Sequence, residues 1–129
     1  MTEIREYCKR IAEELEAVAE GKMYRCAVCG ELIRADALEA ECPDCAGELE
    51  QIGMLDYFED ALDVEYSIGG SGREYRSVCV MVACGGPNVY VNTGTKKVEL
   101  YWGTDREDFG LSQSVIATID DAFEELYNC

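Results

Sequence analysis

Eight cysteines in a chain of 129 residues are the first candidates for chemistry. Four of them form two Cys-x-x-Cys pairs, Cys26 with Cys29 and Cys42 with Cys45. Each pair can fold as a tight turn that presents two thiolates while backbone amides point toward the sulfurs. Four clustered thiolates supply the tetrahedral sulfur cage that Zn²⁺ accepts in closed structural sites. We therefore predict that Cys26, Cys29, Cys42 and Cys45 together hold one zinc ion.

Other uses of the paired cysteines stay open at this stage. A single Cys-Pro-x-Cys, such as Cys42 to Cys45, suggests a thioredoxin-like dithiol, but a second pair so close favours shared coordination. Iron bound as in rubredoxin uses similar turns, which usually lie much farther apart than the twelve residues that separate these two pairs. Four unligated thiols are the remaining alternative.

The segment YRCAVCGELIRADALEAECPDCAGELE resembles a zinc ribbon, with CxxCG and CPxC in the usual order. The resemblance covers about a quarter of the chain and is specific to metal binding rather than to any activity. It implies Zn²⁺ as the cofactor. It also implies that the hairpin between the two cysteine pairs is small, because its twelve residues are fewer than in many ribbons.

The chain contains no histidine, which excludes histidine-based triads and histidine-mediated proton transfer. Four further cysteines lack partner spacing. Cys84, in ACGGPN, is the one among them placed where a nucleophile can sit, but it lacks the usual base. We expect buried thiols at Cys8 and Cys79, an incidental tail residue at Cys129, and a protein that is not an enzyme.

Three segments must position these residues. Residues 1–21 carry apolar side chains at helical spacing and predict an amphipathic N-terminal helix that ends at Gly21. Residues 22–52 hold both cysteine pairs and form the expected zinc-ribbon module. Residues 53–129 show new periodicities and form the expected α+β domain.

The pattern within the last segment predicts helix, strands and helix. MLDYFEDALD is typical of a short helix that buries Leu55, Phe58 and Leu62. Four strands follow at VEYSI, YRSVCVMVA, NVYVN and KVELYW, then a polar loop, GTDREDFG, and a last helix from about Ser112. The predicted fold class is α+β: a two-layer four-stranded antiparallel meander flanked by helices, with an N-terminal helix and an inserted zinc ribbon.

The charge is strongly one-sided, with 11 basic and 27 acidic residues and a formal net charge of −16. This balance disfavours direct binding to nucleic acid or to anionic membranes, which are polyanions, and favours basic protein partners. No apolar run approaches the roughly 20 residues of a membrane span, and MTEIREYCKRIAEE does not have the pattern of a signal peptide. We expect a cytoplasmic protein.

The predicted helices stack acids on acids at i,i+4 spacing. Each such pair costs an isolated helix roughly 0.2–0.5 kcal/mol, and acids near a helix C-terminus also oppose the helix dipole. We expect these carboxylates to form a surface for a basic partner, with general acidity tolerated for solubility as the alternative. The pairs are Glu16 and Glu20, Asp56 and Asp60, Glu59 and Asp63, Asp120 and Glu124, and Asp121 and Glu125.

In size, charge and lack of catalytic groups the chain resembles the small DNA-mimicking inhibitors of phages and mobile elements, such as anti-CRISPR and antirestriction proteins. Its run GGPNVYVNTGTKKVELYW is also similar to small phage and mobile-element proteins. The resemblance implies a non-enzymatic inhibitor that blocks a basic nucleic-acid-binding machine by electrostatic mimicry. The alternative is a zinc-ribbon adaptor or regulatory protein-interaction module, whose contacts would lie at the ribbon tip from Leu32 to Ala40.

Overall fold

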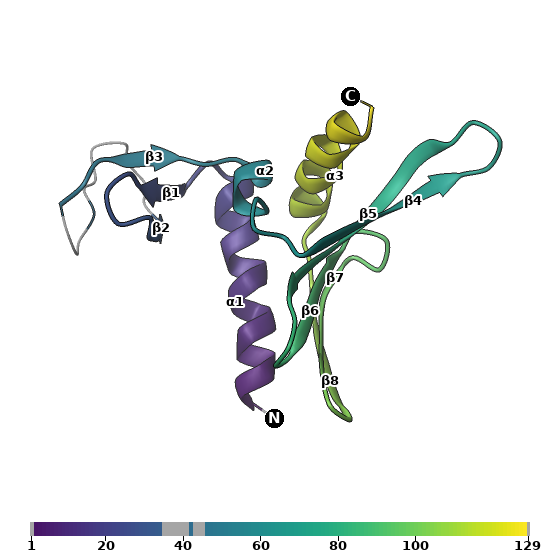
Figure 1. The fold of residues 1–129 in the computed structure, drawn as a ribbon, viewed down its shortest axis with the longest axis horizontal. Coiled ribbons are helices and arrows are strands. Elements are labelled where there is room, and N and C mark those ends of the chain that lie inside the picture. The colour runs from purple at the N-terminus through teal and green to yellow at the C-terminus, as the bar shows by residue number, and fades with distance from the viewer. Residues whose placement is uncertain (1, 35–41, 43–45, 129) are drawn as a thin grey trace.

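A computed structural model describes residues 2–34, 42 and 46–128. One three-stranded sheet has the order β2-β1-β3, and one five-stranded sheet has the order β4-β5-β6-β7-β8 (Figure 1). The elements are α1 (Thr2–Ala19), β1 (Met23–Cys26), β2 (Leu32–Arg34), β3 (Leu49–Gln51), α2 (Met54–Tyr57), β4 (Asp63–Gly69), β5 (Glu74–Ala83), β6 (Asn88–Asn92), β7 (Lys97–Trp102), β8 (Asp105–Gly110) and α3 (Gln113–Tyr127).

The five-stranded sheet is an antiparallel meander with helices on one of its faces, which confirms the α+β class. Its centre is a row of valines in direct register, Val80 opposite Val91 and Val91 opposite Val98, all completely buried. Leu15 of α1 and Ile119 of α3 are also completely buried and belong to the same core. β-branched side chains pack well on a pleated surface, so this row fixes which face of the sheet the helices cover.

The predicted number of strands is wrong, because the stretch expected to be a polar loop is a fifth strand. β8 pairs with β7 along its whole length, from Lys97 opposite Gly110 to Trp102 opposite Asp105. β8 is an edge strand, and its half-buried residues alternate at Asp105, Glu107 and Phe109. Only one of those three is apolar, so the alternation gave no hydrophobic signal in the sequence.

The predicted helix after residue 53 is much shorter than expected. α2 is a single turn that buries Met54, and Phe58 directly after it is also buried. The carboxylate of Asp56 accepts a hydrogen bond from the Gly53 amide at 3.0 Å, which fixes the start of the turn. The chain then leaves the helix to reach β4, so Leu55 and Leu62 are 43% and 56% exposed instead of buried.

The ends of α1 and α3 follow the expected capping chemistry. Gly21 has a φ of +75°, and the amides of Gly21 and Lys22 donate to the carbonyls of Val18 and Ala17. This is a Schellman motif and confirms the predicted stop at Gly21. Ser112 caps α3 by accepting a hydrogen bond from the Val115 amide at 3.2 Å.

The three-stranded sheet extends from the end of α1 (Figure 1). β1 begins in the main core at Met23 and ends at the cysteine cluster with Cys26, only three residues later. The returning chain is held at the same place, because the Ile52 amide donates to the Met23 carbonyl and the Gln51 side chain donates to the Gly21 carbonyl. Among the helices of the described residues, none is both long and apolar enough to cross a membrane.

The cap of α3 gives a stability prediction. Ser112 also donates to the carboxylate of Glu16 at 2.8 Å, so it joins the start of α3 to α1. Ser112→Ala should lower the free energy of unfolding by about 1–2 kcal/mol, measured by denaturant titration. Ser114→Ala, on an exposed residue of the same first turn, is the control and should change it by less than about 0.5 kcal/mol. Equal effects of the two substitutions would contradict the capping role.

Candidate metal centre and acidic surface

Three of the four predicted metal ligands lie together. The sulfur atoms of Cys26, Cys29 and Cys42 all lie within 4.8 Å of one another, with Cys26 and Cys42 buried and Cys29 exposed. The sulfurs of Cys29 and Cys42 are 3.7 Å apart, far longer than a disulfide bond. A tetrahedral site with metal–sulfur bonds of about 2.3 Å has sulfur–sulfur edges of about 3.8 Å. The cluster is therefore compatible with metal binding, including zinc, while Cys45 lies outside the described residues.

The two cysteine turns share one backbone pattern. In the first, the Gly30 amide donates to the Cys26 carbonyl and the Cys26 amide donates to the Glu31 carbonyl. Around Cys42 the same two bonds recur: the Ala46 amide donates to the Cys42 carbonyl, and the Cys42 amide donates to the Gly47 carbonyl. Gly30 and Ala46 also share a positive φ, of +76° and +57°. Two matched turns that face each other bring their first cysteines into one cluster.

Backbone amides point toward a sulfur in the first turn, as the sequence predicted. The amides of Val28 and Cys29 each lie 3.4 Å from the Cys26 sulfur. Such hydrogen bonds favour the thiolate form that a metal ion requires. Three clustered sulfurs, with amide hydrogen bonds to one of them, are compatible with metal binding.

Gly47 is a residue of this centre that sequence reasoning missed. A β-carbon at this position would lie 2.7 Å from the Cys26 sulfur and 2.8 Å from a methyl group of Val28. The second turn can therefore approach the first only because residue 47 has no side chain. The one available signal was a glycine five positions after Cys42, and a glycine at that spacing does not by itself indicate a contact with another cysteine turn.

The cysteines outside the ribbon have other surroundings. Cys8 is completely buried, and its burial, with the charges of Glu107 and Asp108 nearby, raises the pKa of its thiol to about 11. Burial also raises the pKa of the half-buried Cys79. Cys8 matches the expected buried thiol, whereas Cys79 is only half-buried, because it lies on the face of β5 opposite the buried Val78 and Val80. Cys84 is exposed, and Cys129 lies outside the described residues.

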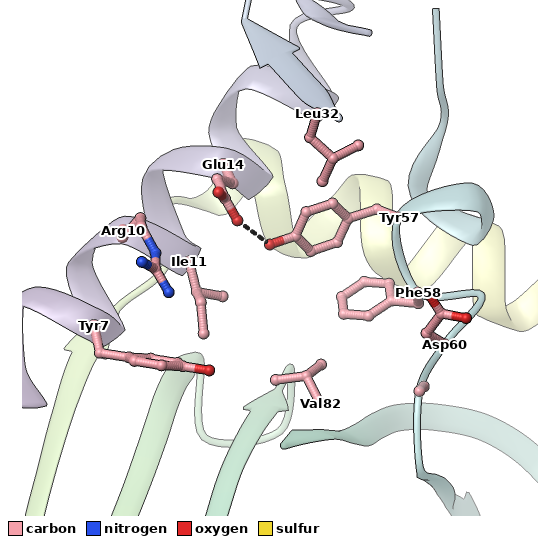
Figure 2. A pocket seen from close by; sticks show the side chains of 10 residues that line it. Tyr7, Arg10, Ile11, Glu14, Leu32, Tyr57, Phe58, Asp60 and Val82 are labelled. Carbon is pink, nitrogen blue, oxygen red and sulfur yellow. Dashed lines mark hydrogen bonds between the residues drawn. The ribbon is translucent and has the colours of Figure 1, made fainter. Parts of the chain in front are cut away.

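The ribbon meets the rest of the molecule at a small cavity (Figure 2). Leu32 of β2 lines it on one side, and the rings of Tyr57 and Phe58 line it on another. The Tyr57 hydroxyl donates a hydrogen bond of 2.6 Å to the carboxylate of Glu14 on α1. Burial, together with this carboxylate, raises the pKa of Tyr57, so its hydroxyl stays protonated and keeps the bond.

The predicted acidic surface is divided by the structure, because several of its carboxylates have partners inside the molecule. Asp120 is half-buried and accepts a hydrogen bond of 2.6 Å from the Tyr75 hydroxyl, which joins α3 to β5. Glu16 accepts from the Ser112 hydroxyl at the start of α3. Asp56 accepts from the Gly53 amide, so its carboxylate caps α2. These acids hold elements in place.

Two acids near the three-stranded sheet form ion pairs. The i,i+4 acid pairs predicted for the helix after residue 53 are wrong. Glu20 lies 3.5 Å from Lys22, and Glu59 lies 3.3 Å from Arg25. Glu59 and Asp60 follow α2 in a turn, and Asp63 begins β4. The pairs of Asp56 with Asp60 and of Glu59 with Asp63 therefore do not lie on one helix. Glu16 and Glu20 keep helical spacing through a backbone hydrogen bond of 3.0 Å.

Three of the four predicted acids of α3 take no part in such contacts. Asp121, Glu124 and Glu125 are exposed, and within the described residues their carboxylates make no hydrogen bond or ion pair. α3 has no basic residue in its last turn, and neither has α1. The C-terminal ends of both helices point toward the upper end of Figure 1, with α2 beside them. The C-terminal end of α1 lies beside the start of α3, where Ser112 donates to Glu16, and the last turn of α3 with its acids extends beyond it.

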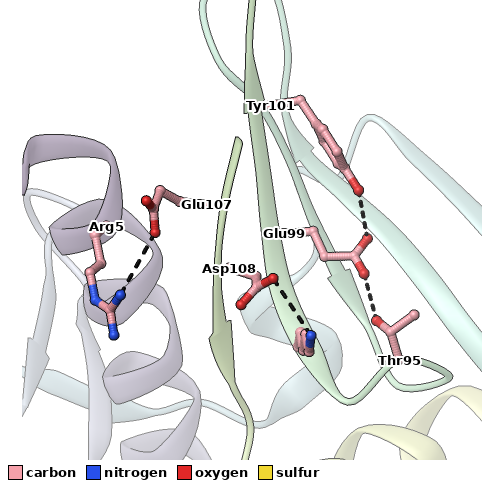
Figure 3. Close-up of polar contacts among 7 residues, drawn as sticks. Arg5, Thr95, Glu99, Tyr101, Glu107 and Asp108 are labelled. Carbon is pink, nitrogen blue, oxygen red and sulfur yellow. Dashed lines mark hydrogen bonds and ion pairs between the residues drawn. The ribbon is translucent and has the colours of Figure 1, made fainter. Parts of the chain in front are cut away.

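Charges of both signs lie on β7, β8 and the N-terminal half of α1 (Figure 3). Arg5 of α1 lies 3.9 Å from Glu107 of β8, and Lys97 lies 3.6 Å from Asp108 across the last two strands. Glu99 accepts hydrogen bonds from two neighbouring hydroxyl groups. Exposed acids without an ion pair also lie elsewhere among the described residues, for example Glu6, Glu13 and Glu65, and the acids at the end of α3 form one such group.

The close approach of Gly47 to Cys26 predicts that adding a methyl group at residue 47 weakens metal binding. We expect the wild-type protein to hold about one Zn²⁺ per chain by elemental analysis, and Gly47→Ala to weaken Zn²⁺ binding at least about tenfold in competition with a chelator. Gly86→Ala is the control, since a β-carbon there meets nothing within 4 Å. Equal affinities of the two variants, or no bound zinc or iron in the wild type, would contradict the site.

Comparisons with known proteins assign no family to these features. No family model, curated protein or solved structure matches the chain.

Proposed function

We propose that this chain is a non-enzymatic, zinc-stabilised acidic binding protein that occupies a basic surface of a nucleic-acid-binding machine. In this proposal Cys26, Cys29, Cys42 and Cys45 hold one Zn²⁺, and the ion serves the fold rather than a reaction. The acidic end of the molecule takes the place of nucleic acid on the partner. Inhibition follows because the partner's Lys and Arg side chains are already occupied.

The observation that carries the proposal is the exposed acidic end of α3. Glu124 and Glu125 lie in the last turn and oppose the helix dipole, and neither they nor Asp121 make an ion pair within the described residues. Asp121 and Glu125 also repel each other at i,i+4 spacing. Side chains that lower helix stability and have no use inside the fold are what a surface for a basic partner requires.

The chemistry of the rest of the molecule supports a binding role. The thiols of Cys8 and Cys79 have raised pKa values, so they are poor nucleophiles at neutral pH. With no histidine in the chain, a cysteine or serine has no imidazole base beside it. The carboxylates of Glu14, Glu16 and Asp120 are already engaged by hydroxyl groups of other elements.

The acidic end can be tested with matched charge removal. Asp121→Asn, Glu124→Gln and Glu125→Gln in one variant should weaken partner binding at least about tenfold and remove most of the salt dependence of the association rate. Removing two like-charge pairs, Asp120 with Glu124 and Asp121 with Glu125, should leave stability equal or higher by roughly 0.4–1 kcal/mol. The partner is isolated from the native host by affinity capture, and binding is then measured with the purified proteins.

The control removes three charges elsewhere: Glu6→Gln, Glu65→Gln and Asp105→Asn should leave partner affinity within about twofold of the wild type. Asp120 is kept in both variants because of its bond with Tyr75. Duplex DNA should compete with the chain for the captured partner, while the chain alone should not shift labelled DNA. Equal affinity of the two variants, or an absence of competition by DNA, would overturn the mimicry proposal.

A second candidate function, a protein-interaction adaptor, is favoured by one apolar residue of the ribbon. Val28 lies between Cys26 and Cys29 and is 73% exposed, and Leu32 nearby is also exposed. Large apolar side chains in water at a rigid turn can dock on another protein. The remainder of the expected ribbon tip, residues 35–40, lies outside the described residues.

Val28→Ser separates the two functions. If the acidic end makes the contact, Val28→Ser and the control Leu62→Ser should both leave partner affinity unchanged, because both side chains are exposed and neither carries charge. A loss of at least about tenfold in Val28→Ser alone, with zinc content kept, would assign the contact to the ribbon. The measurement is the same titration of the captured partner.

A further inference from the structure

The cavity between the ribbon and the helices has the composition of a ligand site (Figure 2). Its volume is about 230 Å³, below the roughly 300–1,000 Å³ of sites for drug-sized ligands, so its occupant must be small. Its lining comes from four separate segments, which are α1, β2, the α2 turn and the end of β5. The apolar part of the lining is Ile11, Leu32, Phe58 and Val82.

Arg10 lines this cavity without a carboxylate partner. Glu14 is four residues further along α1, at a spacing where Arg and Glu usually pair. The Tyr57 hydroxyl instead engages the Glu14 carboxylate at 2.6 Å. The Arg10 guanidinium lies 4.8 Å from the centre of the Tyr7 ring, and no described carboxylate lies within ion-pair distance of it.

Tyr7 supplies a second donor to the same space. Figure 2 shows its hydroxyl pointing into the cavity, on the side where Arg10 lies, while Asp60 lies on the opposite side. Among the described groups, no acceptor engages this hydroxyl. A guanidinium and a hydroxyl above an apolar floor complement an anionic head on an apolar body.

We propose that this cavity binds a small organic monocarboxylate. Its carboxylate lies on Arg10 and the Tyr7 hydroxyl, and its apolar body packs against Ile11, Phe58 and Val82. A dianion such as phosphate is disfavoured, because one arginine supplies the positive charge and the whole chain carries −16. The lining also holds the carboxylates of Glu14, which the Tyr57 hydroxyl engages, and of Asp60 on the opposite side, so the carboxylate of the ligand must lie at the Arg10 side.

Phenylacetate is the probe, and phenylacetamide is the matched neutral ligand. Titration followed by amide chemical shifts should give saturable binding of phenylacetate, with shifts confined to the cavity, at concentrations up to about 10 mM. Phenylacetamide should bind at least about tenfold more weakly, since it cannot form the charge-assisted bond with Arg10. Equal binding of the two, or no saturation with phenylacetate, would overturn the proposal.

Two substitutions locate the site. Arg10→Gln should weaken phenylacetate binding at least about tenfold, and Tyr7→Phe should weaken it by a smaller factor. Arg106→Gln is the control, because that guanidinium also lies over a tyrosine ring, at 5.8 Å from the centre of Tyr101, but away from the cavity. Arg10 and Arg106 are both exposed, so their replacement leaves the fold intact, which a melting curve verifies. If Arg10→Gln bound phenylacetate as tightly as the wild type, the proposal that Arg10 binds the carboxylate would be wrong.

This test needs no protein partner. The protein can therefore fail to bind phenylacetate and still bind a basic protein through its acidic end. It can equally bind phenylacetate and fail to bind a basic protein.

Discussion

The apolar layer between the five-stranded sheet and the helices α1 and α3 is the constraint on which the rest of the structure depends. A chain with a net charge of −16 repels itself, and this repulsion opposes compaction. The row of Val80, Val91 and Val98 is completely buried beneath Leu15 and Ile119. Each fully buried side chain of this size contributes roughly 1.5–3 kcal/mol. Because this apolar layer stabilises the fold, the surface can carry acidic side chains that do not contribute to stability.

The ribbon depends on that layer at one end and on its cysteines at the other. β2 and β3 have three residues each, and so small a segment buries too little apolar surface to fold without a metal or a neighbouring core. β1 supplies both supports, because Met23 lies in the main core and Cys26 lies in the thiol cluster. Arg25 between them pairs with Glu59 and donates to the Asp56 carbonyl. The position of the thiols is thereby tied to the α2 turn.

The sequence was informative where a local pattern carries the physics. Spacing alone identified Cys26, Cys29 and Cys42, and glycine chemistry placed the end of α1 at Gly21. The sequence does not reveal β8, because an edge strand needs few apolar residues. It predicts a longer α2, because Leu55 and Leu62 have the spacing of a buried helical face although both are exposed. The cavity had no local signal, since Arg10 and Val82 are brought together only by the tertiary fold.

The acids of the helices divide into two groups with different physical consequences. Glu14, Glu16 and Asp120 each accept a hydroxyl hydrogen bond from another element, so their charges are part of the packing of α1 and α3. Replacing any of them changes the fold before it changes the surface. Asp121, Glu124 and Glu125, which make no hydrogen bond or ion pair within the described residues, gain nothing from the folded state and lose a little through repulsion and the helix dipole. A binding partner is therefore best sought through the second group, whose removal alters the electrostatic field while the protein stays folded.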